Sequence, residues 1–168
     1  MPSITEGQLT FQFPDDWKAS KFDNWSFYRN QFQSVCGGAK AVDVLAIEPR
    51  VCFWKIEVKD YRQDRRTKTV DLAQEVAEKV RDSLAAVVAA QSNANDANEK
   101  ALATAALQCH RLRVVLHLEQ PPKHSKLFPR AIDPAAVQQR LKQLVKAIDP
   151  HPLVLEMRRL HGVAWTVA

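Results

Sequence analysis

Cysteine is scarce in this chain, and the few cysteines are scattered. Cys36, Cys52 and Cys109 are the three cysteines in 168 residues, no two of them form a Cys-x-x-Cys pair, and the five histidines are dispersed. An odd number of separated cysteines without clustered histidines argues against a disulfide framework and against a zinc site. We therefore expect free thiols in a reducing compartment.

Long apolar runs are missing as well. No stretch approaches the roughly 20 apolar residues of a membrane-spanning helix, and residues 1–6 show no basic segment followed by an apolar run. We therefore expect a cytoplasmic protein that makes no use of a membrane. Hydrophobic residues still make up 46% of the chain, which is enough for a core, and the length suits a single domain over residues 1–168.

Positive charge is in excess and is confined to two stretches. The net charge is +5; residues 50–68 contain seven basic and three acidic groups, and residues 110–168 contain ten and four. A local positive field attracts polyanions, and phosphate contacts by Lys and Arg supply most sequence-independent affinity for nucleic acid. Nucleic acid, DNA in the first place, is therefore the expected partner. A solvated basic surface explains the charge equally well.

Hydrophobic periodicity predicts alternating strands and helices. Strands are expected at 8–13, 42–47, 51–59, 112–118, 153–157 and 163–167, and helices at 25–35, 70–90, 97–107 and 134–148. Thr69 or Asp71 can cap the long helix, and a loop is expected from Pro121 to Pro129. This order predicts an α/β domain in which helices flank a mixed central sheet.

The two strands expected at 42–47 and 51–59 carry the most informative polar residues. Asp43 interrupts an apolar strand, and Glu57 and Lys59 are two residues apart on the next strand. Residues i and i+2 of a strand share a face, so Glu57 and Lys59 point the same way, and hairpin pairing can bring Asp43 beside them. The alternative is purely structural: Asp43 is a satisfied polar group at a strand end, and Glu57 and Lys59 form a surface ion pair worth about 0–1 kcal/mol.

Val42–Ile47 followed by Ile56–Lys59 resembles the signature of the PD-(D/E)XK nuclease-like superfamily, particularly the hairpin of Holliday-junction resolvases and restriction-type endonucleases. The order of elements from Gln8 to Leu118 is similar to the core of that family. The resemblance implies a restriction-endonuclease-like fold in which Asp43 and Glu57 bind Mg2+ or Mn2+ and Lys59 orients or activates the attacking water.

The function that this resemblance implies is a metal-dependent endonuclease that hydrolyses phosphodiester bonds in DNA, in repair, recombination or defence. Such chemistry needs an activated water and neutralisation of charge on the phosphate, and a hard cation held by carboxylate oxygens can supply both. A compact ammonium group such as that of Lys59 adds positive charge near the attacking water.

Two positions depart from the family pattern. Many members place a glutamate on the first helix, but residues 24–35 contain no acid; Asp23 is the nearest candidate, and it also suits a helix N-cap. In some branches Gln-x-x-x-Tyr follows on the next helix, whereas here Gln74 is followed by Glu78, so Gln74 is either a site residue or a solvated helix residue. The alternative function is therefore an inactive member of the fold that binds nucleic acid or a protein partner.

The basic segment after Lys59 is the expected nucleic-acid contact. Tyr61 and Arg62 follow the Glu-x-Lys directly, and Arg65, Arg66 and Lys68 are placed to contact phosphates. Tyr61 can also stack on an exposed base. The alternative is a mobile basic loop without a ligand. A further hypothesis makes the long helix at 70–90 a surface for a partner subunit or a second copy of the chain.

Overall fold

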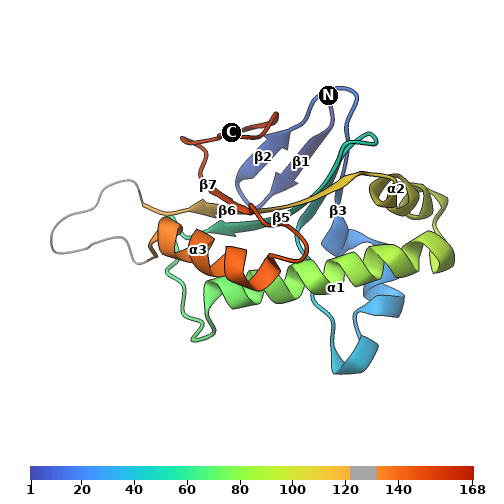
Figure 1. The fold of residues 1–168 in the computed structure, drawn as a ribbon, viewed down its shortest axis with the longest axis horizontal. Coiled ribbons are helices and arrows are strands. Elements are labelled where there is room, and N and C mark those ends of the chain that lie inside the picture. Colours follow the sequence, from blue (N-terminus) through green and yellow to red (C-terminus); the bar gives the residue numbers. More distant parts are fainter. Residues whose placement is uncertain (122–131) are drawn as a thin grey trace, which may run out of the picture.

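Two β-sheets and a layer of helices build the protein (Figure 1). This computed structural model describes residues 1–121 and 132–168. The larger sheet has the strand order β3-β4-β5-β6-β7. Strands β3, β4 and β5 are antiparallel neighbours, whereas β6 and β7 run parallel to β5. Its strands are β3 (Lys18–Lys21), β4 (Val44–Glu48), β5 (Cys52–Asp60), β6 (Arg111–Glu119) and β7 (Leu153–Leu155). The predicted α/β fold with a mixed sheet is confirmed.

A smaller antiparallel sheet lies against one face of the larger one. It consists of β1 (Ser3–Glu6), β2 (Leu9–Gln12) and β8 (Thr166–Val167), in the order β1-β2-β8. Gly7 has a φ of 58° in the turn between β1 and β2, a conformation that glycine adopts without strain. Large aromatic side chains fill the space between the sheets: Phe11, Phe13, Trp17, Trp54 and Trp165.

Three α-helices form a second core on the other face of the larger sheet (Figure 1). They are α1 (Leu72–Asn93), α2 (Ala97–Leu107) and α3 (Pro134–Val145). Each begins at an aspartate whose carboxylate accepts a hydrogen bond from a backbone N–H of the first turn, namely Asp71, Asp96 and Asp133. Pro134 occupies the first turn of α3, as the sequence predicts.

The helix predicted at 25–35 is replaced by three short helical turns. These are η1 (Phe22–Asn24), the π-helical η2 (Tyr28–Phe32) and η3 (Val35–Gly37). The Tyr28 hydroxyl donates to the Ala39 carbonyl at 2.9 Å, which draws the chain back on itself. Val35, at the end of the predicted range, is 40% exposed. The prediction of one continuous helix at 25–35 is therefore wrong, although Trp25 and Tyr28 are buried in the core on the helix side.

Several strands also differ from the prediction. β1 and β3 were not predicted, and β7 and β8 are shorter than the runs at 153–157 and 163–167. Of the loop predicted from Pro121 to Pro129, all but Pro121 lies outside the described residues. None of the helices in the two described ranges combines the length and apolarity that a membrane span requires.

Strand β5 separates two environments because its side chains alternate between the two faces of the sheet. Cys52, Trp54, Ile56 and Val58 face the smaller sheet, while Phe53 faces the helices. Lys55, Glu57 and Lys59 share the parity of Phe53 and therefore lie on the helix side. Glu57 and Lys59 thus meet charged residues of α1, and Trp54 packs toward the smaller sheet.

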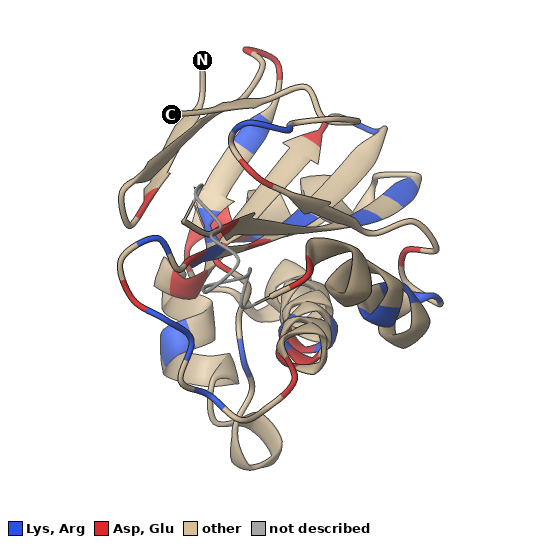
Figure 2. Ribbon diagram, turned by 90° about the vertical axis from the view of Figure 1, so that its left-hand side faces the viewer, with Lys and Arg blue, Asp and Glu red and all other residues tan. Residues whose placement is uncertain are grey.

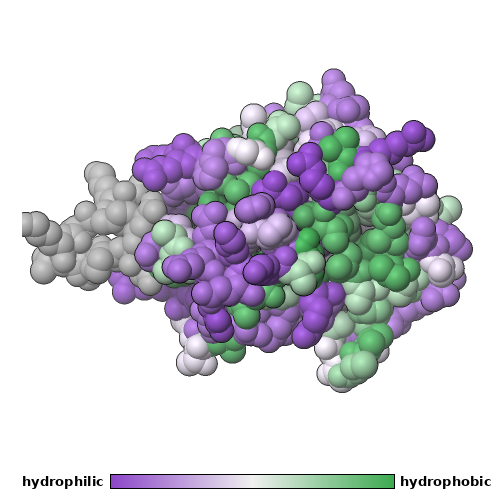
Figure 3. Space-filling model, viewed as in Figure 1, coloured by the Kyte–Doolittle hydropathy of each residue, from purple (hydrophilic) through white to green (hydrophobic). Residues whose placement is uncertain are grey.

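The outer surface of the helix layer includes an apolar area. Figure 3 shows hydrophobic colour gathered on the right-hand side of this view, where Figure 1 places the C-terminal half of α1. Val88 of α1 is 53% exposed. The hypothesis that this helix contacts a partner stays a prediction.

Candidate functional site

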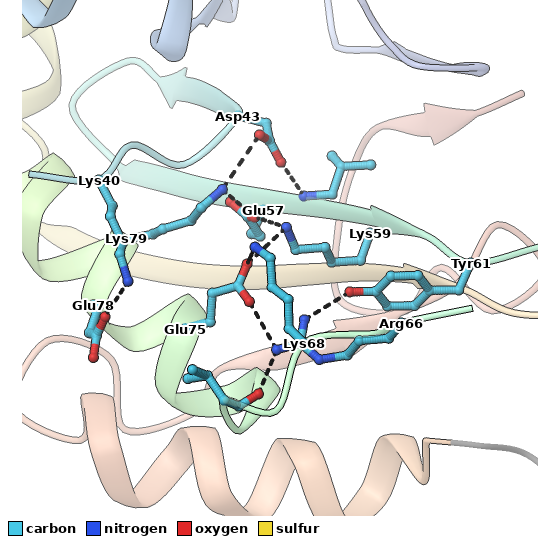
Figure 4. A network of polar contacts seen from close by, with 12 residues as sticks. Lys40, Asp43, Glu57, Lys59, Tyr61, Arg66, Lys68, Glu75, Glu78 and Lys79 are labelled. Atoms are coloured by element: carbon cyan, nitrogen blue, oxygen red, sulfur yellow. Dashed lines mark hydrogen bonds and ion pairs between the residues drawn. The ribbon is translucent and has the colours of Figure 1, made fainter. Parts of the chain in front are cut away.

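The hairpin of β4 and β5 brings the three predicted site residues together (Figure 4). Asp43 lies immediately before β4, and its Oδ2 accepts a hydrogen bond from the backbone N–H of Val58 at 2.7 Å. Glu57 is fully buried, and its Oε1 lies 2.8 Å from Lys59 Nζ. The structure therefore places Asp43, Glu57 and Lys59 close together, as the hairpin pattern predicts.

Helix α1 adds two charged residues that the sequence interpretation missed. Lys79 Nζ lies 2.6 Å from Glu57 Oε1 and 3.9 Å from Asp43 Oδ1. Glu75, one turn earlier on the same helix face, lies 3.2 Å from Lys59 Nζ. Both residues lie next to the apolar stripe of α1, and this position in the sequence could have indicated that their side chains face the sheet. We call Asp43, Glu57, Lys59, Glu75 and Lys79 the carboxylate–lysine cluster.

The connection between β5 and α1 is attached to this cluster through Glu75. Arg66 Nη2 lies 2.9 Å from Glu75 Oε2 and donates to the Val70 carbonyl, while its Nη1 donates to the Tyr61 hydroxyl at 3.1 Å. Lys68 Nζ lies 3.1 Å from Glu75 Oε1. Tyr61, Arg66 and Lys68 are thus engaged within the protein, although the Lys68 side chain remains 63% exposed.

The other predicted contact residues are placed differently. Arg62 is held by Asp60, with Nε at 2.8 Å from Oδ1 and Nη2 at 2.6 Å from Oδ2. Arg65 is exposed, and its side chain has no partner in the part of the chain that the structure describes. Figure 2 looks onto this end of the molecule, where the connection projects with several Lys and Arg positions along it.

Asp23 and Gln74, the two further candidates, have no hydrogen bond or ion pair with the carboxylate–lysine cluster in the described part of the chain. Asp23 is in η1, where its backbone carbonyl accepts from Arg29 and its Oδ1 is buried without a hydrogen-bond partner among residues 1–121 and 132–168. Gln74 donates from Nε2 to Glu78 Oε1 at 3.2 Å, which is an ordinary bond between neighbouring turns of α1.

Burial and mutual charge shift the pKa values within the cluster. Burial, together with the negative charge of Glu57, raises the pKa of Asp43 to about 7. Burial opposes charge on Lys59, but the carboxylates of Glu57 and Glu75 outweigh it and hold the pKa of Lys59 above its usual range. Burial likewise opposes charge on Glu75, yet Arg66, Lys59 and Lys68 lower its pKa to about 2.

These contacts bear on the Mg2+ or Mn2+ that the family resemblance implies. Glu57 Oε1 already accepts from two ammonium groups, and Asp43 Oδ2 accepts from a backbone amide. Within the described ranges, no group of three or more His, Cys, Asp or Glu side chains is arranged to hold a metal ion. The residues as arranged do not fit a divalent cation, although Glu57 Oε2 is buried without a hydrogen-bond partner in the same ranges. The magnesium or manganese cofactor stays a prediction.

Comparison with known proteins gives one informative similarity. The chain is 34% identical over 164 residues to a cysteine–tRNA ligase of Neisseria meningitidis serogroup A / serotype 4A (strain DSM 15465 / Z2491). The match covers 79% of this chain and 23% of the ligase, so the chain spans about a quarter of that relative's length. No family model and no solved structure matches the chain.

This similarity corrects the functional prediction. A chain that shares a third of its aligned residues with a tRNA ligase is not a metal-dependent DNA endonuclease, and the nuclease function predicted from the hairpin is wrong. The physical reason is visible in the cluster, where lysine ammonium groups lie against the carboxylate that was expected to bind the cation. The comparison thus connects this chain with part of a tRNA ligase.

Proposed function

We propose that this chain is a tRNA-binding domain that serves a tRNA ligase in the cytoplasm. The observation that carries the proposal is its similarity to a segment of a cysteine–tRNA ligase over 79% of its own length. The net charge of +5 supports the proposal, since phosphate contacts supply most of the affinity for any nucleic acid.

The connection between β5 and α1 is the surface that we assign to tRNA. Its backbone is anchored because Arg66 binds Glu75, the Val70 carbonyl and the Tyr61 hydroxyl at once. Arg65 projects from this anchored segment without a partner among the described residues, and Lys68 keeps 63% of its side chain exposed. A loop that is ordered before binding loses less conformational entropy when it meets a phosphate backbone. In this proposal Arg65 and Lys68 contact phosphates.

We further propose that β3, β4, β5, α1 and β6 form the restriction-endonuclease-like core that the PD-(D/E)XK resemblance implies, used as a scaffold. Support comes from the antiparallel run β3-β4-β5, followed by α1 and by β6 parallel to β5. An experimental structure with β6 antiparallel to β5 would contradict this part of the proposal.

Fluorescence anisotropy with labelled nucleic acids tests the binding function. Unfractionated tRNA and a DNA duplex with the same number of phosphates are titrated with the protein at several salt concentrations. We expect tRNA to bind about tenfold or more tightly than the duplex. Equal affinity for the two, or no saturable binding of tRNA, would contradict the proposal.

A double variant, Arg65→Ala with Lys68→Ala, tests the assigned surface. We expect it to weaken tRNA binding and to reduce the slope of log affinity against log salt by about one for each lost phosphate contact. The matched control is Arg81→Ala with Lys100→Ala, which removes the same charge from exposed positions on α1 and α2. If both double variants lose affinity equally, the connection is not the contact surface.

A further inference from the structure

A second basic region lies on and beside α3, and the surface that we assign to tRNA does not include it. Residues 110–168 contain ten basic and four acidic groups. Three of these acids serve the fold itself, because Asp149 and Glu119 are buried and Asp133 caps α3. Residues 134–148, which include the whole of α3, contain no acid. The basic residues of this segment are Arg140, Lys142 and Lys146.

A pocket of about 380 Å3 opens between α3 and the segment that leads into β7. Its lining residues are Arg113, Ala135, Gln138, Gln139, Lys142, His151, Pro152 and Leu153. None of them is acidic. Four of them recur along α3 at intervals of three and four residues, so that one face of the helix forms a wall of the pocket.

Hydrogen bonds fix the walls of this pocket relative to one another. Gln138 Nε2 donates to the Pro152 carbonyl at 3.1 Å and joins α3 to the opposite wall. The Arg113 guanidinium is held by Asp149 Oδ2 at 3.2 Å and by the His151 carbonyl at 2.9 Å. A ligand that binds here therefore meets groups that are already positioned, which lowers the entropic cost of binding.

The charge of this pocket is positive. Asp149 balances Arg113, but Lys142 is exposed and has no ion-pair partner in residues 1–121 and 132–168. Arg113 uses Nε and Nη2 in the contacts described above, which leaves Nη1 without a partner among the described residues. The His151 side chain is exposed and makes no hydrogen bond within the same ranges. The pocket thus offers several donors and an unbalanced cation.

We propose that this pocket binds a phosphate group, with Lys142 and Arg113 as its cationic contacts and His151 as a further donor. Ammonium and guanidinium groups form charge-assisted hydrogen bonds with phosphate oxygens. The apolar part of the lining suits the organic portion of a phosphate ester. Such a phosphate belongs to an RNA or to a small phosphorylated molecule. This site is separate from the contact that we assign to Arg65 and Lys68.

Nuclear magnetic resonance of the histidine rings tests the proposal with an internal reference. His151 lines the pocket, whereas His110, which is also exposed, lies just before β6 and is not a lining residue. Inorganic phosphate replaces chloride at constant pH and ionic strength. We expect the His151 signals, identified by their loss in His151→Gln, to move saturably while the His110 signals stay in place.

The variant Lys142→Ala should weaken phosphate binding about tenfold, the loss of one charge-assisted hydrogen bond. Its matched control is Lys146→Ala, which removes the same charge from an exposed position next to the end of α3 that does not line the pocket. The control should change the affinity by about twofold or less, because exposed charges at a distance are screened. Gln139→Glu, which adds a carboxylate to the pocket wall, should abolish binding.

Equal losses for Lys142→Ala and Lys146→Ala would show a solvated basic surface only and overturn the proposal. So would His151 signals that do not move with phosphate, or that move no more than those of His110.

Transfer RNA and adenosine 5′-monophosphate identify the source of the phosphate. If the site serves tRNA, tRNA prevents the movement of the His151 signals by phosphate, and Lys142→Ala lowers the affinity for tRNA. If it serves a small phosphorylated molecule, Lys142→Ala leaves the affinity for tRNA unchanged, and adenosine 5′-monophosphate binds more tightly than inorganic phosphate. A failure of phosphate binding leaves the tRNA contact of Arg65 and Lys68 untouched, because that contact has its own double variant.

Discussion

Replacing Glu75 by glutamine should remove one of the largest electrostatic contributions to stability. Glu75 is 4% exposed and its carboxylate meets Arg66, Lys59 and Lys68, which lower its pKa from 4.5 to about 2. A carboxyl whose pKa is lower in the folded state stabilises the fold above the pKa of the unfolded chain, and this stabilisation disappears as the pH falls through the folded value. This lowering of the Glu75 pKa corresponds to about 3 kcal/mol of stability at neutral pH.

Urea denaturation over a range of pH measures this contribution, and urea is preferred because guanidinium chloride is a salt that screens charges. We expect Glu75→Gln to lower the free energy of unfolding by about 3 kcal/mol at pH 7, and by less than about 1 kcal/mol at pH 2. Trypsin should also cleave the variant faster between residues 61 and 71, since Arg66 and Lys68 lose their anchor.

The matched control is Glu78→Gln, about one helical turn after Glu75 on α1. Glu78 pairs with Lys40 at 2.6 Å, but its side chain is 29% exposed, so its loss should change the free energy of unfolding by about 1 kcal/mol or less. Equal losses for the two variants at pH 7 would refute the reasoning. So would a loss for Glu75→Gln that is the same at pH 7 and at pH 2.

Three further changes test other parts of the structure. Because the pKa of Asp43 is raised to about 7, the wild-type fold loses stability as the pH rises from about 4 to about 7. Asp43→Asn lacks this titration, so its free energy of unfolding should fall less than that of the wild type over the same range. In urea denaturation, the difference between variant and wild type should shift in favour of the variant by about 3 kcal/mol from pH 5 to pH 8. Burial lowers the pKa of Lys55 to about 8, so its charge destabilises the fold below that pH, and Lys55→Met should raise the free energy of unfolding by up to about 3 kcal/mol at pH 6, an advantage that disappears as the pH approaches 10.5. Asp96→Ala removes the acceptor for the backbone N–H groups of Asn98 and Glu99 and should lower the thermal midpoint by an amount that corresponds to about 1 kcal/mol, whereas no change would show that this cap is dispensable.

The parts of the fold that the sequence predicted well are those with strong local patterns. The apolar run before Glu48 and the stripe along α1 each match one period, and both elements are where the pattern indicates. β1 and β3 were missed because each has four residues with little apolar character and is defined by its pairing partner instead. Such strands depend on contacts between distant residues, which local pattern does not contain.

The carboxylate–lysine cluster shows the same division. Asp43, Glu57 and Lys59 could be placed together because strand alternation and hairpin pairing are local rules. Glu75 and Lys79 could not, because their contacts depend on where α1 crosses the sheet, and helix periodicity fixes only the face that they occupy. The sequence therefore predicts the three hairpin residues of the cluster but not the contact of Lys79 with Glu57.

The alternation along β5 restricts how this protein can change in length. One residue inserted between Cys52 and Glu57 would move every later side chain of the strand to the opposite face, so that the Glu57 carboxylate would enter the aromatic layer and Val58 would enter the ionic one. Homologous chains should therefore vary in length at the turn before β5 or beyond Asp60, and keep this strand free of insertions. The length of this strand is therefore constrained by two different environments at once, the ionic contacts on its helix side and the aromatic packing on its other side.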